Sequence, residues 1–512
     1  MMTRRQLILV TVSGMVGMFL AAMDVTIVGT AMPTIVATLG GMPLYSWVFS
    51  AYMLTSTTTV PIFGKLADLY GRRSTYLVSI GAFLLGSMLC GLARNMTELV
   101  VYRALQGIGG GGLIPITLTI IGDLYPLEKR ARVQGLFSGM WGLASIVGPL
   151  IGGFLVDNLS WRWLFYINIP VGLLATALIY FFFEERHTPR PHAVDYPGLL
   201  TLTGSVTTLL LVTLVGGRNY PWLSWPVMSL LAGSAALLYL FVRIEKKARE
   251  PLLSLDLLRN KVIASCSLSA GLTGMGMFGA ISFVPLFIQG VLGTSATRAG
   301  LALTPQTLAW TTASIISSHL VLRRGYRFTI TTGLLLVSAA GYNLARMGQE
   351  TPYWGAVANM LVLGAGLGLC MTAFIIAVQS AVTREQRGMA TSSNLFFRSM
   401  GGTIGVTVMG AAMTARLGSL LQAGLPGEGL QGLPPEIAAY LSDPQAILLP
   451  AVRASMPAAL LEAMQVLLSD AVRVVFWIAL GVTLLALVST VFLPGGKASD
   501  HAVRDPVPAT SE

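Results

Sequence analysis

The sequence predicts an all-α membrane protein, and its composition, its apolar stretches and its basic loops each lead to that prediction. Of the 512 residues, 54% are hydrophobic and only 11% are charged. An average soluble domain carries about 25% charged residues. So few charges cannot cover the surface of a soluble fold of this length. The composition therefore excludes a soluble protein, a disordered chain and a secreted disulfide scaffold.

The apolar stretches are long enough to cross a bilayer, which takes about 20 residues of α-helix. Fourteen are predicted, near 7–30, 45–66, 75–93, 97–121, 133–157, 165–184, 197–217, 223–243, 262–285, 297–320, 327–347, 353–382, 389–414 and 472–493. Helix is expected because a strand edge that faces lipid has no hydrogen-bond partners. The first stretch follows Arg4 and Arg5 but precedes no cleavage site, so we expect an uncleaved helix.

Basic residues fall mostly in alternate connections between these stretches. If the N-terminus is cytosolic, most of the 33 Lys and Arg residues lie in cytosolic segments. This bias predicts a multi-pass protein of the cytoplasmic membrane with both termini in the cytosol. It also accounts for most of the net charge of +11, so no nucleic-acid partner is expected.

Glycine-rich stretches in corresponding positions indicate two related halves. Gly107 and Gly109–Gly112 in the fourth stretch match Gly364, Gly366 and Gly368 in the twelfth. The pairing predicts a six-helix bundle over 1–184, two inserted helices with cytosolic linkers over 185–261, a second six-helix bundle over 262–493 and a cytosolic tail over 494–512. Within the second bundle, the proline-containing segment 415–471 is predicted to be a long extracytoplasmic loop. Repeated halves are typical of secondary transporters whose site lies between them.

Metal and nucleotide sites are not expected. Cys90, Cys266 and Cys370 lie in apolar runs, and the four His residues lack ligand spacing. The chain has no Gly-x4-Gly-Lys-Ser/Thr run, so ATP does not drive it directly. We therefore expect no cofactor.

The connection after the second stretch reads Gly64-Lys65-Leu66-Ala67-Asp68-Leu69-Tyr70-Gly71-Arg72-Arg73. Gly64 and Gly71 permit close packing and a sharp turn, while Arg72 and Arg73 can bond helix carbonyls or a carboxylate. The run resembles the signature loop of the major facilitator superfamily, with Tyr70 where that family often has a basic residue. The resemblance implies that the loop latches the cytosolic side between conformations.

Two further runs resemble motifs of the same superfamily. The run Arg103-Ala104-Leu105-Gln106-Gly107 resembles its second motif, in which the Arg is linked to proton coupling. An alternative is that Arg103 snorkels to the outer interface. The fifth stretch carries Gly148, Pro149, Gly152 and Gly153, which permit a close, kinked helix crossing. This pattern is similar to the motif of the antiporter branch, which implies export rather than uptake.

Asp24 is the one acidic residue well inside a predicted span, in Met23-Asp24-Val25-Thr26. An unpaired carboxylate there favours its protonated form, which makes Asp24 the candidate proton-binding residue. This segment, the run Trp161–Pro170 and the count of fourteen spans resemble the fourteen-helix drug:proton antiporter family 2. The resemblance implies the major facilitator fold, in which two inserted central helices separate two six-helix bundles.

Asp24 and Arg103 are expected at the same depth. Each lies about six residues from the outer end of its stretch, which is roughly 9 Å at 1.5 Å per residue. We therefore predict that the two side chains share one network, in which protonation of Asp24 changes its partners.

The remaining candidates lie mostly in the second half. Arg398 is a second buried cation, and we consider two interpretations: a structural or coupling cation, or a charge satisfied by helix carbonyls. Four further side chains are candidates for the wall of a substrate cavity, although each could instead pack against a neighbouring helix or face lipid: Gln289, Trp310, Gln379 and Asn394.

These features predict a proton-coupled antiporter that exports hydrophobic, cationic or neutral, drug-like compounds and is not an enzyme. Its expected partners are a small-molecule substrate, protons and the bilayer. The alternative is an exporter of one endogenous metabolite, lipid or peptide, which shares every motif. A channel requires neither the repeated halves nor the latch-like loop, and no nucleophile with a base indicates a membrane enzyme.

Overall fold

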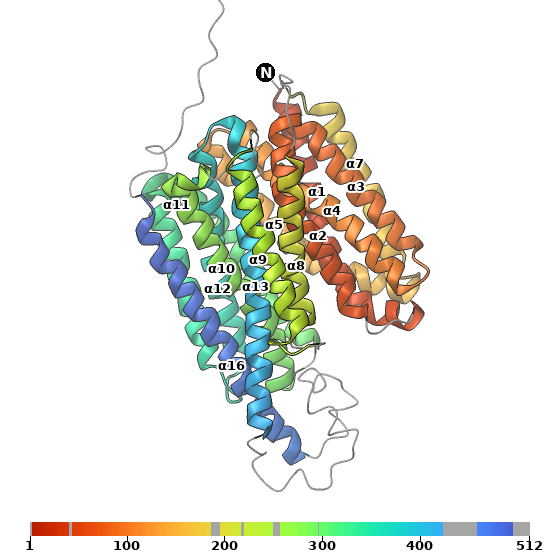
Figure 1. The fold of residues 1–512 in the computed structure, drawn as a ribbon, viewed down its shortest axis with the longest axis vertical. Coiled ribbons are helices and arrows are strands. Elements are labelled where there is room, and N and C mark those ends of the chain that lie inside the picture. Colours follow the sequence, from red (N-terminus) through yellow and green to blue (C-terminus); the bar gives the residue numbers. More distant parts are fainter. Residues whose placement is uncertain are drawn as a thin grey trace, which may run out of the picture.

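The computed structural model describes residues 3–39, 44–185, 195–216, 220–248, 256–294, 296–422 and 458–494. These residues form an all-helical bundle (Figure 1). In the first half the helices are α1 (Arg4–Leu39), α2 (Tyr45–Tyr70), α3 (Arg72–Leu92), α4 (Met96–Leu124), α5 (Leu127–Asn158), α6 (Trp163–Tyr166) and α7 (Asn168–Phe182).

Two helices then precede the second half: α8 (Tyr196–Val215) and α9 (Trp225–Glu245). The second half contains α10 (Lys261–Leu286), the π-helical turn η3 (Phe287–Val291), α11 (Ala296–Arg346), α12 (Tyr353–Ser380), α13 (Arg387–Gln422) and α16 (Ala458–Ser489). Short 3₁₀ turns lie at η2 (Leu257–Arg259), η4 (Arg384–Gln386) and η6 (Thr490–Phe492).

Polar side chains cap several of these helices where the chain turns. Asn95 accepts a hydrogen bond from the backbone N–H of Glu98 at the start of α4, and Asn260 does the same for Val262 at the start of α10. Such caps satisfy backbone donors that the first helical turn leaves unpaired. They help to fix where these helices begin.

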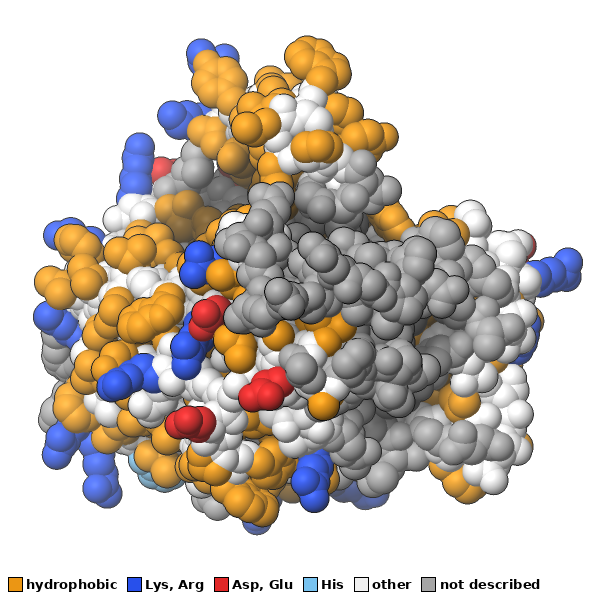
Figure 2. All heavy atoms as spheres, turned by 90° about the horizontal axis from the view of Figure 1, so that it is seen from below, with side chains coloured by type: hydrophobic (Ala, Val, Ile, Leu, Met, Phe, Trp, Pro, Cys, Tyr) orange, Lys and Arg blue, Asp and Glu red, His pale blue; other side chains and the backbone are white. Residues whose placement is uncertain are grey.

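The helices are suited to a membrane by length and composition. Nine described helical segments are long and apolar enough to cross a bilayer. Large apolar side chains are exposed, among them Trp225, Trp354 and Phe181, and orange hydrophobic side chains occupy much of the described perimeter in Figure 2. Lipid contact explains this exposure, which water would not favour. The count of fourteen spans stays a prediction.

The structure agrees with one predicted boundary in the second half and differs from another. The stretches predicted at 297–320 and 327–347 are two helices that meet at a kink within α11, where Gly325 has a non-helical φ of +84°. The predicted loop 415–471 is helical at both ends, because α13 continues to Gln422 and α16 already begins at Ala458. Residues 423–457 of that loop lie outside the described residues.

The two halves meet along a few helices. In Figure 1 the first half and the second half stand side by side, with α8 and α9 in front of the junction. α2 packs against α13, α5 packs against α11, and α8 contacts both α2 and α13. We call the end of the bundle where α1 begins, at the top of Figure 1, the proximal end, and the opposite end the distal end. The proximal end is the one predicted to be cytosolic.

Candidate transport site

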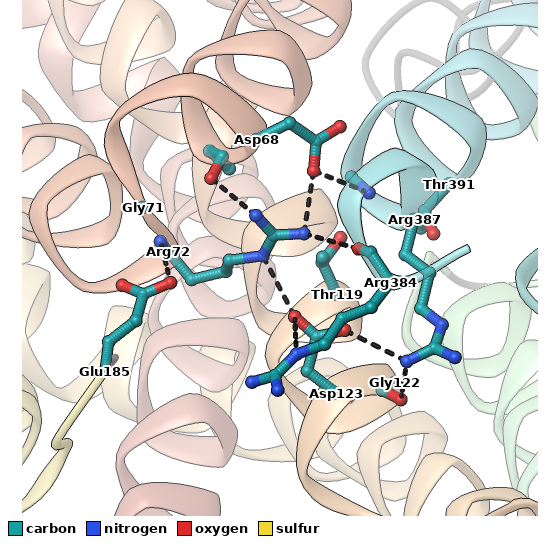
Figure 3. Close-up of polar contacts among 12 residues, drawn as sticks. Asp68, Gly71, Arg72, Thr119, Gly122, Asp123, Glu185, Arg384, Arg387 and Thr391 are labelled. Atoms are coloured by element: carbon teal, nitrogen blue, oxygen red, sulfur yellow. Dashed lines mark hydrogen bonds and ion pairs between the residues drawn. The ribbon is translucent and has the colours of Figure 1, made fainter. Parts of the chain in front are cut away.

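Charged side chains from both halves meet at the proximal end. This group, which we call the proximal cluster, consists of Asp68, Arg72, Asp123, Arg384 and Arg387 (Figure 3). Arg72 forms ion pairs with Asp68 at 2.8 Å and with Asp123 at 2.9 Å. Arg387 reaches Asp123 at 3.3 Å from the other half. Because these side chains are largely buried, except for that of Arg384, their attraction is weakly screened by salt.

Asp68 also binds the start of a helix in the second half. Its carboxylate accepts hydrogen bonds from the backbone N–H groups of Gly388, at 3.1 Å, and Met389, at 2.7 Å. Arg72 in turn donates to the backbone carbonyl of Arg384. A carboxylate is favourable at a helix N-terminus, where unpaired N–H groups and the helix dipole attract negative charge. These contacts hold the halves together at the proximal end.

Gly71 makes the turn that brings Arg72 into the cluster. Its φ of +89° is a conformation that side chains disfavour. A Cβ at this position would also meet the carboxylate of Glu185. Glu185 accepts hydrogen bonds from the N–H groups of Arg72 and Arg73, both at 2.8 Å, and so caps α3. The Arg73 guanidinium stacks on Tyr180 of α7.

Close packing and an amide pair complete the proximal contact. A Cβ on Gly64 would collide with Ser392 of α13, so glycine permits the α2–α13 approach. Gln134 of α5 donates to Gln379 of α12 at 3.1 Å, and Gln379 donates to the carbonyl of Leu118. In this conformation the halves are joined at the proximal end.

A second charged site lies deep in the first half. Asp24 of α1 and Arg103 of α4 form an ion pair at 2.6 Å, and both side chains are at most 1% exposed. Asp24 lies about 20 residues from the start of α1, or roughly 30 Å from the proximal end. Sequence analysis predicted that these residues share one network, and the structure places them in direct contact. In this conformation Arg103 does not snorkel to a surface.

Two amides complete the coordination of the carboxylate. Gln106 donates to Asp24 at 2.8 Å, and Asn168 of α7 donates to the same oxygen at 3.1 Å. Arg103 lies 4.3 Å from the centre of the Tyr52 ring and donates to the carbonyl of Val48. Asp24 thus accepts bonds from three side chains on α4 and α7. Protonation of Asp24 would replace one accepted bond by a donated one, so its neighbours would have to rearrange.

The glycine motif of α5 contributes to packing beside this network. A Cβ on Gly148 would collide with Thr26, two residues after Asp24. Thr26 donates to the carbonyl of Ala144 at 3.1 Å, which joins α1 to α5. Gly152 is buried in the same helix. The side chain of Pro149 and the surroundings of Gly153 lie outside the described part of the chain.

The possible cavity residues have mixed environments. Gln379 and Asn394 are buried and bonded to protein atoms, Asn394 to the carbonyl of Cys266 at 3.2 Å, so here they join helices rather than face open space. The amide groups were predicted from polarity alone, which does not distinguish a helix contact from a cavity wall. Gln289 lies in η3 and Trp310 in α11, both partly exposed. Their role stays a prediction.

Sequence analysis missed several residues of these sites. Asp123 and Glu185 end apolar stretches, where acids are common, and only the fold brings them to Arg72. Gln106 and Asn168 are neutral and stand inside motifs that were interpreted as glycine and aromatic patterns. The signal that was available for Gln106 is its position one helical turn after Arg103.

Comparisons with known proteins agree with this architecture. The family model described as Major Facilitator Superfamily matches residues 14–406. The multidrug transporter protein MdtP of Bacillus subtilis is 40% identical over 506 residues, which cover 96% of this chain and 93% of MdtP. The multidrug resistance protein 3 of Bacillus subtilis is 35% identical, with 94% of each chain covered.

Solved structures share the fold at low sequence identity. The human organic anion transporter MFSD10 (TETRAN) superposes with a TM-score of 0.62 and 14% identity, over 94% of this chain and 99% of that one. The proton:xylose symporter XylE, bound to 6-bromo-6-deoxy-D-glucose, gives the same TM-score and identity over 96% and 97%. At this identity the likeness concerns the fold.

Proposed function

Because the chain belongs to the major facilitator superfamily, a family of membrane transporters and not of enzymes, we propose that it is a proton-coupled antiporter. Its cargo would be hydrophobic, cationic or neutral, drug-like compounds, exported across the cytoplasmic membrane. Its termini would lie in the cytosol, and it would need no cofactor. The fourteen-helix drug:proton antiporter family 2 is the proposed branch.

The similarity to two multidrug proteins over most of the chain supports the cargo class. The enclosed ion pair between Asp24 and Arg103 is the observation that carries the coupling mechanism. A buried carboxylate that lacks contact with water can exchange its proton only when the surrounding helices open. Asp24 would release its proton on one side and bind one on the other, and the change in its partners would bias the conformation.

The proximal cluster supports the alternation between two states. The ion pair between Asp123 and Arg387 and the bonds from Asp68 to α13 stabilise the conformation in which the proximal end is closed. Opening that end would break them together, so the cluster would set the balance between the two states. Proton binding at Asp24 and opening of the cluster would then be the two linked steps of export.

The test is transport of a fluorescent lipophilic cation into inverted membrane vesicles with an acidic lumen. The native protein should accumulate the dye, and Asp24→Asn should abolish gradient-driven accumulation. The matched control is Asp256→Asn, because Asp256 is an exposed acid that pairs with Arg259 outside the long helices. Accumulation by Asp24→Asn equal to that of the native protein would refute the coupling role. Absence of accumulation by correctly folded native protein would instead favour export of an endogenous compound.

A further inference from the structure

Arg398 has no counter-charge in the described part of the chain. It lies on α13 and is partly exposed, yet its Nε atom is buried without a hydrogen-bond partner. None of the hydrogen bonds and ion pairs among the described residues involves its guanidinium. Within the described residues, the alternative that helix carbonyls satisfy this charge is therefore not supported.

The other buried arginines differ in this respect. Arg103 pairs with Asp24, and Arg72 pairs with two aspartates. Burial of a cation in a membrane protein is costly, so such residues normally pair or line a wet path. Arg398 is more exposed than Arg103 and Arg72, and it has no such partner among the described residues.

No acid of the second half pairs with Arg398 among the described residues. On α16, Glu462 and Asp470 lie inside a helix long enough to span a membrane, and Asp470 pairs with Arg473. Between Lys261 and Arg416 the acidic residues are Glu350 and Glu385, and both stand in connections between helices. Asp24 in the first half is already bonded to Arg103, Gln106 and Asn168. A counter-anion for Arg398 must therefore come from outside these residues.

The backbone holds Arg398 at depth. Arg398 lies ten residues beyond Gly388, and Gly388 contacts the proximal cluster. At 1.5 Å per residue, this places Arg398 about 15 Å from the cluster, at a depth between the cluster and Asp24. A Cβ on Gly274 of α10 would collide with the Arg398 carbonyl and meet its Cγ at 3.1 Å. One turn earlier, Asn394 ties α13 to α10. The stem of the side chain is thus packed against α10, and the guanidinium cannot reach the proximal surface.

We propose that Arg398 binds a carboxylate of the transported compound, which extends the cargo to amphipathic carboxylates and zwitterions. The planar guanidinium offers parallel N–H donors that match the two oxygens of a carboxylate. Partly buried apolar residues of α10, Met275 and Phe278, lie close to α13 and suit the hydrophobic part of such a molecule. This inference rests on the proposed export function.

The experiment compares two dyes with one ring system: rhodamine B, a zwitterion with a free carboxylate, and its ethyl ester, a cation without one. Transport of each is measured in inverted vesicles for the native protein, R398Q and R398K. R398Q should raise the KM for rhodamine B about 10-fold or more and change that for the ester less than about 2-fold. R398K should recover part of the affinity for rhodamine B. The matched control is R346Q, because Arg346 is exposed and bonds only locally to Tyr342.

An equal loss of transport of both dyes in R398Q would overturn the proposal, since it would indicate that Arg398 acts in folding or in coupling. Unchanged KM for rhodamine B would overturn it as well. If native vesicles accumulate neither dye, the export proposal fails, and fluorescence anisotropy of each dye with the purified full chain still tests Arg398. Selective loss of rhodamine B binding in R398Q would support the carboxylate site in that case. Equal binding of rhodamine B by R398Q and the native protein would reject it.

Discussion

The two halves repeat one backbone turn and carry different charges on it. Gly71 has φ +89° and ψ +154°, and Gly325 in the second half has φ +84° and ψ +165°. Three residues earlier, the first half has Asp68 and the second has Leu322; one residue later, the first has Arg72 and the second has buried Tyr326. The repeat preserves the geometry of the turn, while Asp68 and Arg72 of the first loop form hydrogen bonds with the backbone of the other half.

The same contrast holds deeper in the bundle. The first half pairs its embedded Arg103 with an acid, whereas Arg398 in the second half has no such partner among the described residues. The comparison suggests that the first half carries the internal charge balance of the transport cycle. The second half leaves one charge available for a ligand.

The largest expected effect is the difference in stability between the Arg103→Gln and Arg398→Gln variants. Removal of Arg103 leaves the Asp24 carboxylate buried without its cation, which should cost about 3–5 kcal/mol and lower the thermal unfolding temperature clearly. Arg398→Gln breaks no ion pair, so its unfolding temperature should stay at or above that of the native protein. Thermal unfolding of both purified variants in detergent checks this. Equal destabilisation of the two would contradict the difference drawn between the halves.

Arg103→Ala should also abolish gradient-driven transport. Without the guanidinium, protonation of Asp24 no longer changes an ion pair, so the proton gradient is uncoupled from export. Vesicle uptake measures this, with Arg346→Ala as the exposed control. Intact proton-driven uptake by Arg103→Ala would exclude the shared network as the coupling element.

A smaller effect is expected from Asp68→Asn, paired with Leu322→Asn. The amide loses the ion pair with Arg72 and part of the bond to the N-terminus of α13, so the closed proximal end should be destabilised by about 1–3 kcal/mol. Transport should fall about 10-fold or more, while the Leu322 variant should remain near native activity. Solvent accessibility of a cysteine introduced at Ser392, measured by thiol labelling, should rise in the Asp68 variant. A protected thiol would show that the end stays closed without Asp68.

Gly71→Ala and Gly325→Ala probe the shared turn. Both place a Cβ at positive φ, at a cost of roughly 1–2 kcal/mol. Gly71→Ala should cost more because its Cβ also meets the Glu185 carboxylate that caps α3. Unfolding temperatures of the two variants give the difference. A greater loss in Gly325→Ala would reverse the predicted order.

The smallest effect is expected from Asn168→Ala, compared with Asn359→Ala. Both amides are buried, but Asn168 donates to the Asp24 carboxylate and Asn359 donates to the neutral carbonyl of Ala340. Bonds to charged groups are stronger, so the Asn168 variant should lose about 1 kcal/mol more and transport several-fold more slowly. Denaturation and vesicle uptake of the two variants test this. Equal uptake would mean that Asn168 does not position Asp24.

The sequence by itself determined the helical membrane class, the repeated halves, the residues of the first latch-like loop and the candidate pair Asp24 and Arg103. These follow from local properties: hydropathy over about 20 residues, glycine spacing and the rarity of charge inside a span. An estimate of depth was enough to predict that Asp24 and Arg103 lie close together, because the rise per residue is fixed in a helix.

Only the tertiary structure decided the partners. Asp123 and Asn168 lie on helices distant in sequence from their partners, and Glu185 follows the end of α7. Their contacts with Arg72, Arg73 and Asp24 depend on how the helices rotate and cross. The same holds for Gln379, which bonds to the other half. It holds also for Arg398, because its lack of a counter-charge among the described residues depends on every described helix around it. Helix packing fixes these relations through side-chain shape across the whole interface, which no single segment contains.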